Sequence, residues 1–284
     1  MDLVIQSPTL SSETVAAFKV AAVAQRAERQ VSSARLVNIQ DDESTRKAAT
    51  ALGELFSCDV AFVPRRQSLA DFRVLALDMD STLINIETLD EVAALAGCGT
   101  AVAALTEAAM RGEISDYKES LRRRVALLTG VEAGLLQRVA DERMRANAGA
   151  TELIAGCKAA GLTVLLATGG FTFFAERMQR QLGIDNVRAN ELVMAGGRLT
   201  GEVTGPDGGD LIDAQGKAQA VRDVCAALGC ATERAIAIGD GANDLAMMKI
   251  AGMSVAYRAQ PAVRGAATHA IDHSGLDAVL NWFA

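Results

Sequence analysis

Three short apolar runs, each followed directly by a polar turn, constrain the fold of this chain more than any other feature. The runs are Val74–Leu77, Leu162–Ala167 and Ala235–Ile238, and they consist mainly of valine, isoleucine, leucine and alanine. Runs of this length and composition are typical of parallel strands that helices cover on both faces. Because the carboxyl ends of parallel strands lie at one edge of a sheet, the three turns can converge on one site. We therefore predict an α/β fold with a parallel sheet at its centre.

The length of the chain, 284 residues, favours two domains, since domains commonly contain about 100–200 residues. Residues 1–70 alternate between short strand and helix patterns and end near the polar segment Pro64–Ser68. The expected strands are Leu3–Gln6, Leu36–Ile39 and Val60–Val63, and the expected helices are Glu13–Arg29 and Thr45–Phe56. We predict a small N-terminal α/β domain at residues 1–70 and a second domain at residues 71–284.

A long helical stretch separates the first two strands of the second domain. It covers about residues 87–145, which is too long for a simple crossover between parallel strands. The expected helices are Glu87–Ala96, Ala101–Arg111, Tyr117–Leu128 and Val131–Met144. Insertions over the edge of a sheet commonly close on a substrate and exclude water, so we predict an inserted helical cap. The glycine-rich stretch Asn190–Asp213 is expected to form a hairpin and a loop.

The charge and the cysteine pattern exclude several classes of protein. The chain has 28 Lys and Arg against 35 Asp and Glu, and the resulting net charge of −7 would repel a polyanion, so we expect no nucleic-acid partner. Five scattered cysteines indicate reduced thiols rather than a disulfide framework. The sequence has neither an export signal at its start nor an apolar segment of membrane-spanning length. We expect a cytoplasmic protein without a membrane partner.

Two carboxylates follow the first apolar run, at Asp78 and Asp80. Acids this close together are costly unless a cation or a shared proton relieves the repulsion, and Mg²⁺ commonly binds one or two carboxylates. One such acid can attack phosphorus while the other gives a proton to the leaving oxygen. The alternative is that both residues only cap or turn the chain, because Asp is common in turns.

The third apolar run leads into a second acidic turn, Gly239–Leu245. Asp240, Asn243 and Asp244 all offer oxygen ligands to a hard cation, and with the first turn they could form one Mg²⁺ site. A capped helix start is the other interpretation, with Asn243 or Asp244 accepting hydrogen bonds from backbone N–H groups. Both interpretations can hold together.

The second apolar run leads into Thr168–Phe171, which places a hydroxyl and two glycines before a helix. A hydroxyl and unhindered N–H groups at the start of a helix can bind a phosphate, although a glycine pair is often only a turn. Lys217 also lies at the start of an expected helix, where the helix dipole disfavours a cation. Charge neutralisation around a phosphate ester would explain a lysine at that position.

Taken together, these motifs resemble the haloacid dehalogenase superfamily, and within it the branch that hydrolyses phosphoserine. The resemblance covers about Arg73–Ala284 and implies a Rossmann-like parallel sheet with an inserted helical cap. It rests on an ordered set of motifs, Asp78–Leu83, Glu87–Glu91, Ala109–Glu113, Ser120–Val125, Thr168–Phe171, Lys217 and Gly239–Asp244.

The resemblance implies an Mg²⁺-dependent phosphatase that releases serine as the last step of serine biosynthesis. Asp78 would be the nucleophile that forms an aspartyl-phosphate, and Asp80 would be the general acid and base. Asp78, the backbone carbonyl of Asp80, and Asp240 would bind the metal. Residues that grip the phosphate would be Thr168, Gly169, Lys217 and Asn243, with Asp244 in a supporting role.

From the cap, the resemblance implies that Glu87 binds the substrate ammonium group and Arg124 its carboxylate, with Met110 and Tyr117 lining the pocket. Arg122 and Arg123 are adjacent alternatives to Arg124, and two of three neighbouring arginines on a helix are normally solvated. The chain departs from the usual pattern of the family in three places. Thr168 replaces serine, Tyr117 replaces phenylalanine, and the loop at residues 112–117 is one residue longer.

Two other functions share these sequence features. A phosphotransferase would use the same first half-reaction and pass the phosphoryl group to another alcohol. A non-catalytic sensor would bind a metabolite through residues 1–70, although the complete set of acids at both turns argues against a dead enzyme. The N-terminal domain would serve either regulation or the formation of a homodimer.

Overall fold

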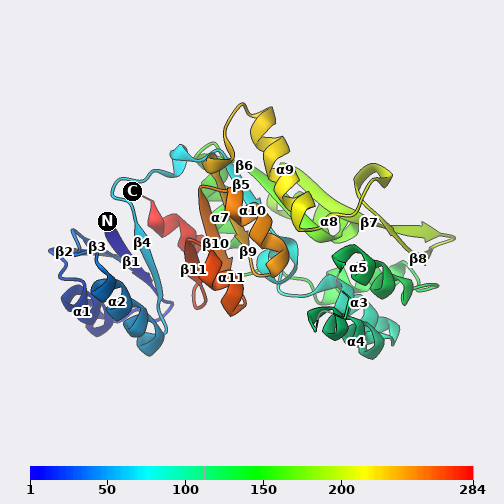
Figure 1. The fold of residues 1–284 in the computed structure, drawn as a ribbon, viewed down its shortest axis with the longest axis horizontal. Helices are drawn as coiled ribbons and strands as arrows, with labels where there is room; N and C mark the ends of the chain where they lie inside the picture. The colour runs from blue at the N-terminus through cyan, green and yellow to red at the C-terminus, as the bar shows by residue number, and fades with distance from the viewer. Residues whose placement is uncertain (112, 115, 284) are drawn as a thin grey trace.

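The computed structural model describes residues 1–111, 113, 114 and 116–283, and it contains two β-sheets. A four-stranded sheet belongs to the N-terminal part of the chain, and a seven-stranded sheet forms the centre of the molecule (Figure 1). Helices cover the sheets, and a group of further helices lies beyond the central sheet. The predicted α/β class, with a parallel sheet and an inserted helical cap, is confirmed.

The N-terminal sheet is antiparallel, with the strand order β2-β3-β1-β4. Its strands are β1 (Asp2–Gln6), β2 (Arg26–Arg29), β3 (Ser33–Val37) and β4 (Asp59–Val63). Helices α1 (Ser12–Ala21) and α2 (Glu43–Phe56) cover one face, where Leu3, Ile5 and Phe18 share a buried cluster. Alternate residues of the same strands, Val4 and Val63 among them, face the core of the central sheet. Both faces of this small sheet are therefore covered.

The predicted helix Glu13–Arg29 is wrong in its second half. Helix α1 ends at Ala21, and the chain then turns through Val23, which has a positive φ of 49°. Arg26–Arg29 forms strand β2 and pairs with β3. These residues are good helix formers, but pairing with β3 outweighs their weak local preference. The second strand predicted in this domain, Leu36–Ile39, begins earlier and ends earlier, at Ser33–Val37.

The central sheet has the order β11-β10-β9-β5-β6-β7-β8. All neighbours are parallel except the hairpin of β7 and β8. The three predicted apolar strands, β9, β5 and β6, are adjacent at its centre, and their carboxyl ends share one edge. The strands are β5 (Val74–Leu77), β6 (Thr163–Phe171), β7 (Asn186–Ala195), β8 (Arg198–Thr204), β9 (Ala235–Gly239), β10 (Met253–Tyr257) and β11 (His269–Ile271).

Helices cover both faces of the central sheet, which explains why its inner strands are apolar throughout. On one face, α7 (Ala150–Ala159) and α8 (Thr172–Leu182) contribute to a cluster that contains Leu75 and Leu77. On the other face, α9 (Ala214–Ala227), α10 (Leu245–Ile250) and α11 (Pro261–Ala266) pack on Val74 and Ala76. Val74, Leu75, Ala76 and Leu77 have no exposed surface.

The cap follows β5 and consists of α3 (Thr88–Ala96), α4 (Gly99–Met110), α5 (Tyr117–Ala126) and α6 (Gly134–Glu142). The hairpin of β7 and β8 extends from the central sheet beside α5 (Figure 1). Backbone hydrogen bonds link the hairpin to the segment that follows α5, including Gly130 N–H to Leu199 O at 2.8 Å. Among the described residues, no helix has both the length and the apolar character that crossing a bilayer requires.

The N-terminal sheet is attached to the central sheet through a buried carboxylate at the start of β4. Asp59 accepts three backbone N–H hydrogen bonds, from Asp272 at 2.7 Å, His273 at 3.0 Å and Ser274 at 2.8 Å. Arg35 in β3 adds hydrogen bonds of 3.0 Å to the carbonyl oxygens of Asn281 and Phe283. These charge-assisted bonds orient the two sheets relative to each other.

Candidate active site

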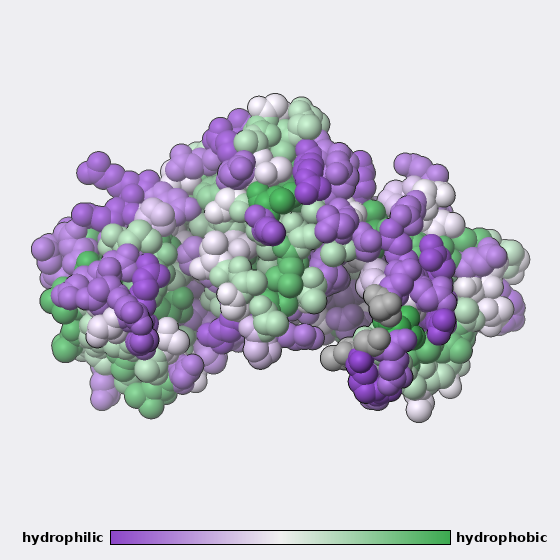
Figure 2. Space-filling view, in the orientation of Figure 1, coloured by the Kyte–Doolittle hydropathy of each residue, from purple (hydrophilic) through white to green (hydrophobic). Residues whose placement is uncertain are grey.

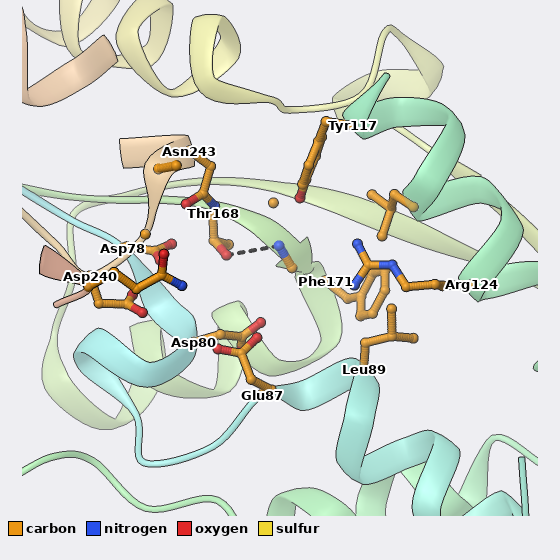
Figure 3. Close-up of a pocket in the computed structure, with 16 residues that line it drawn as sticks. Asp78, Asp80, Glu87, Leu89, Tyr117, Arg124, Thr168, Phe171, Asp240 and Asn243 are labelled. Atoms are coloured by element: carbon orange, nitrogen blue, oxygen red, sulfur yellow. Dashed lines mark hydrogen bonds between the residues drawn. The ribbon is translucent and has the colours of Figure 1, made fainter. Parts of the chain in front are cut away.

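A cavity of about 520 Å³ lies where the carboxyl ends of β5, β6 and β9 meet the cap. Figure 2 shows the surface hollowed between the central part of the molecule and the cap. The acids that follow the strands line one end of the cavity, and side chains of α5 line the other (Figure 3). The lining residues are Asp78, Asp80, Glu87, Leu89, Tyr117, Leu121, Arg124, Thr168, Gly169, Gly170, Phe171, Asp240, Gly241, Ala242, Asn243 and Gln260.

Asp78 lies at the end of β5, and Lys217 binds it from the start of α9. Lys217 Nζ donates to Asp78 Oδ1 at 2.6 Å and to Asp244 Oδ1 at 2.7 Å. Lys217 has no exposed surface, and the two carboxylates are also buried. Asp213 caps α9 by accepting from Gly216 N–H at 2.8 Å, so α9 begins one residue later and holds the lysine in place. A fully buried lysine is stable only when such partners satisfy its charge.

The electrostatics of this pair follow from burial and from neighbouring carboxylates. Burial, then the charge of Asp244, raises the pKa of Asp78 to about 8, although Lys217 opposes the shift. Burial would lower the pKa of Lys217, but the carboxylates of Asp244 and Asp78 outweigh that effect and raise it. The lysine therefore remains charged, and it partly offsets the negative charge at this end of the cavity.

Three carboxylates gather around a common centre. One oxygen each of Asp78, Asp240 and Asp244 lies within 4.8 Å of the others. Thr82 Oγ1 donates to Asp240 Oδ1 at 2.9 Å and fixes that side chain, while burial raises the pKa of Asp240 to about 6. Three hard oxygen donors with mutual repulsion fit a divalent cation such as Mg²⁺. The two acidic turns, distant in the sequence, therefore do converge.

Asp80 lies apart from these three carboxylates, beside Glu87 (Figure 3). Its oxygens accept from Thr88 N–H at 3.3 Å and from Thr88 Oγ1 at 3.1 Å. Burial, followed by the charges of Glu87 and Asp78, raises the pKa of Asp80 well above its usual value. A raised pKa favours the protonated form of the carboxyl group, which is the form that a general acid requires.

Thr168 is almost fully buried beside the acids, and its hydroxyl accepts from Gly170 N–H at 2.9 Å (Figure 3). The predicted strand Leu162–Ala167 is too short at its carboxyl end, because β6 continues to Phe171. Its register with β7 shifts between Ala167 and Phe171, so the glycines form an irregular segment within the strand. This irregularity brings the backbone of Gly169 and Gly170 to the cavity wall.

The turn after β9 has both of the functions that its sequence suggests. Asp244 Oδ2 accepts from the N–H groups of Asp240 at 3.2 Å and Gly241 at 3.0 Å, which caps the turn. Its other oxygen binds Lys217. A β-carbon at Gly239 would overlap the carboxyl group of Asp244, so this close approach requires glycine. Asn243 remains free of the capping bonds and lines the cavity.

The cap contributes Glu87 and one face of α5. Ser81 Oγ donates to Glu87 Oε1 at 2.6 Å, which orients the glutamate at the acidic end of the cavity. Arg124 enters the cavity from α5, whereas Arg122 is exposed and Arg123 forms an ion pair with Glu119. Packing thus distinguishes the three arginines. The side chain of Met110, and Gly112 and Ser115 of the longer loop, lie outside the described part of the structure.

Sequence reasoning missed several residues of this cavity. Gln260 lines it and donates its N–H to Asp240 O at 3.4 Å. It follows β10, whose sequence Met253–Tyr257 has the composition of a strand, so the signal for a fourth converging turn was available. Thr82 and Thr88 orient the carboxylates of Asp240 and Asp80. The sequence does not indicate this role, because nothing near either threonine shows that its hydroxyl is buried beside an acid. Leu89, Leu121 and Phe171 supply apolar lining.

Comparisons with known proteins agree with this geometry. The family model for haloacid dehalogenase-like hydrolases matches residues 75–249. The phosphoserine phosphatase of Albidiferax ferrireducens is 54% identical over 215 residues, which cover 76% of this chain and 91% of that protein. The unliganded crystal structure of a probable phosphoserine phosphatase from Vibrio cholerae covers 99% of this chain and 85% of its own, with 31% identity and a TM-score of 0.84. A phospho-aspartyl intermediate analogue of a phosphoserine phosphatase covers 75% of this chain and 99% of its own, with 32% identity and a TM-score of 0.68.

Proposed function

Because the chain belongs to the haloacid dehalogenase-like hydrolases, we propose that it hydrolyses O-phospho-L-serine to L-serine and phosphate, the last step of serine biosynthesis. One observation carries the proposal. A single cavity has Asp78 bound to a buried lysine at one end and an arginine of the cap, Arg124, at the other. The names of its relatives support the same substrate.

In the first half-reaction, Asp78 is the nucleophile. A carboxylate oxygen of Asp78 bonds to phosphorus in line with the seryl oxygen, and the bond from phosphorus to that oxygen breaks. Asp80 gives its proton to the departing oxygen, so serine leaves as the neutral alcohol. The raised pKa of Asp80, caused by burial and by Glu87, supports its role as the acid.

In the second half-reaction, Asp80 is the base. It takes a proton from a water molecule, whose oxygen attacks the phosphorus of the aspartyl-phosphate. The bond between phosphorus and the Asp78 oxygen breaks, which releases phosphate and restores both carboxyl groups. Thr88, which holds Asp80 through two hydrogen bonds, keeps it in position for both proton transfers.

The cluster of acids supports Mg²⁺ as the cofactor. Asp78, Asp240 and the backbone carbonyl of Asp80 would hold it, while Asp244 is engaged by Lys217 and by the turn that it caps. When bound, Mg²⁺ would offset the charge of the phosphate and of the attacking carboxylate. Lys217 adds a second positive charge at the same end of the cavity.

Phosphoserine carries three charged groups, and the cavity offers a partner for each. Thr168, Gly169, Lys217 and Asn243 would bind the phosphate beside Asp78. Glu87 would bind the ammonium group, and Arg124 would bind the carboxylate. Selectivity follows because a substrate without one of these groups leaves a charged side chain of the protein unpaired.

We also propose that residues 1–70 form a separate domain with a regulatory or dimerising function, and that residues 71–284 form the catalytic domain. The separate sheet and the separate buried cluster of the N-terminal part support this division. The five cysteines are free thiols, which supports a reducing compartment such as the cytoplasm.

The test is phosphate release by the purified protein from phosphoserine, phosphothreonine and a sugar phosphate, with and without Mg²⁺. We expect Mg²⁺-dependent release with a clear preference for phosphoserine. Asp78→Asn should lose at least about 10⁴-fold of the activity and retain its fold, as measured by circular dichroism. Full activity in Asp78→Asn would refute the nucleophile, and turnover of the sugar phosphate alone would refute the substrate.

A further inference from the structure

The side chain of Tyr117 reaches the cavity from the same helix face as Arg124. Tyr117, Leu121 and Arg124 are spaced four and three residues apart along α5, and all three line the cavity. Figure 3 shows the hydroxyl of Tyr117 pointing into the cavity, between Thr168 and Arg124. A β-carbon at residue 169 would collide with this hydroxyl, so Gly169 makes room for it.

Contacts on the cap side position the first turn of α5, which carries Tyr117. Asp116 caps α5 by accepting from Lys118 N–H at 2.9 Å. Lys118 Nζ pairs with Asp210 and, at 3.3 Å, with Asp213, the residue that also caps α9. The first turn of α5 is therefore tied to the segment that positions Lys217.

On the side of the central sheet, a buried side chain positions the backbone next to this hydroxyl. The buried Asn190 donates to Gly169 O at 2.8 Å and accepts from Ile212 N–H at 2.8 Å. One side chain thus holds the backbone beneath the Tyr117 hydroxyl and the backbone next to Asp213. These contacts position the backbone on both sides of the Tyr117 hydroxyl, at the start of α5 and at Gly169.

The charges in the cavity decide which substrate group this hydroxyl meets. Asp78, Asp80, Glu87 and Asp240 line the far end and repel a carboxylate there, whereas Arg124 is the one cation that the cap contributes to the described lining. The phosphate occupies the end with Asp78. Burial raises the pKa of Tyr117, so its hydroxyl stays protonated and can donate.

We infer that Tyr117 is a second carboxylate-binding residue, whose hydroxyl donates a hydrogen bond to the substrate carboxylate beside the Arg124 guanidinium group. The inference rests on the proposed function. A phenylalanine at this position could line the pocket in the same way but would have no hydrogen-bond donor. The hydroxyl therefore gives this chain an added means of selecting substrates that carry a carboxylate.

The test compares Tyr117→Phe with the unaltered protein on two substrates. O-Phosphoserine and O-phosphoethanolamine share the phosphate and the ammonium group, but only phosphoserine has a carboxylate. We expect kcat/KM for phosphoserine to fall about 10- to 100-fold, mainly through KM, because the lost bond has a charged partner. The value for phosphoethanolamine should stay within about twofold.

Tyr257→Phe is the matched control, because it removes the chain's other tyrosine hydroxyl, which lies in the core outside the cavity. It should leave kcat/KM for both substrates unchanged. In Arg124→Ala, the added change Tyr117→Phe should have less effect than it has alone, since both residues bind one group.

Three outcomes would overturn the inference. An unchanged kcat/KM for phosphoserine in Tyr117→Phe would refute it alone, provided that the unaltered protein is active. Equal losses on both substrates would assign the hydroxyl to the phosphate or to a structural role. If the unaltered protein releases no phosphate from phosphoserine, both this inference and the proposed function fail.

Discussion

Ion pairs lie at both ends of the cavity, and they are buried at one end and exposed at the other. At the end formed by the strands, Lys217 lies between Asp78 and Asp244, and the exposed fractions of the three side chains are 1%, 6% and 0%. At the cap end, Lys118 ties α5 to Asp210 and Asp213, and the exposed fractions are 22%, 71% and 27%. Water is therefore excluded from the ion pairs of Lys217, whereas it reaches those of Lys118.

This difference in burial means that the two ends of the cavity are held with different firmness. A buried ion pair is costly to break, because the remaining charge has no water to solvate it, so the reacting groups are held rigidly. An exposed pair contributes little free energy and can break and re-form in water, so it holds the cap end less firmly. The proposed reacting groups lie at the end with the buried ion pairs, and Arg124 lies at the end with the exposed ones.

Lys217→Met should give the largest effect, because it removes the buried ion pairs with Asp78 and Asp244. The change leaves two buried carboxylates without their cation, and we expect a loss of about 3–5 kcal/mol in the free energy of unfolding, measured with a denaturant. Turnover of phosphoserine and phosphoethanolamine should fall together, by about 10²–10³-fold, since both share the phosphate.

Lys249→Met is the control for this change, because Lys249 is an exposed helical lysine outside the cavity. It should alter neither stability nor turnover measurably. If Lys217→Met were as stable as the unaltered protein, the buried pair would not be the rigid element that the comparison requires.

Arg124→Ala should give an intermediate effect that depends on the substrate. Arg124 faces the cavity, and we propose that it binds the substrate carboxylate. We therefore expect kcat/KM for phosphoserine to fall about 10²-fold and kcat/KM for phosphoethanolamine to change little. The ratio of the two kcat/KM values, measured side by side, reports the selectivity of the cap directly.

Arg123→Ala provides a control from the adjacent position. Arg123 binds Glu119 on the solvent side of α5, so its removal should change kcat/KM for neither substrate. A loss of selectivity in Arg123→Ala, without one in Arg124→Ala, would reverse the assignment of the two arginines.

Lys118→Ala should give the smallest effect, because its ion pairs are exposed. We expect a two- to fivefold change in kcat/KM and less than about 1 kcal/mol in stability, with the difference from the unaltered protein shrinking as salt is raised. A large and salt-independent loss would contradict the view that the cap is held weakly. Lys158→Ala, which breaks another surface pair with Asp185, serves as the comparison.

Much of the core could be predicted because its signals are local. The runs that form β5, β6 and β9 are apolar on both faces, and each leads into its own turn, so the sequence indicated the sheet and the edge where Asp78 and Asp240 meet. By contrast, the sequence predicts helix where β2 forms, because Arg26–Arg29 acquires its structure only by pairing with β3.

The cap was harder to predict in detail. The spacing of apolar residues and the residues that end each helix predict the helices of the cap. They do not predict which face of each helix turns toward the cavity. Nothing in the run of three arginines favours Arg124, and only the packing of α5 against the central sheet and hairpin turns it into the cavity. The role of Asn190 between Gly169 and Ile212 was likewise not visible in the sequence.

The sequence by itself determined the buried strands, the acidic turns that end them and the helical insertion. All of these depend on composition and spacing within a few residues, which act on the chain locally. Only the tertiary structure decided that Lys217 pairs with Asp78, 139 residues away, and with Asp244, and which face of α5 lines the cavity. Such contacts form when the core excludes water and leaves a buried charge with a single set of partners.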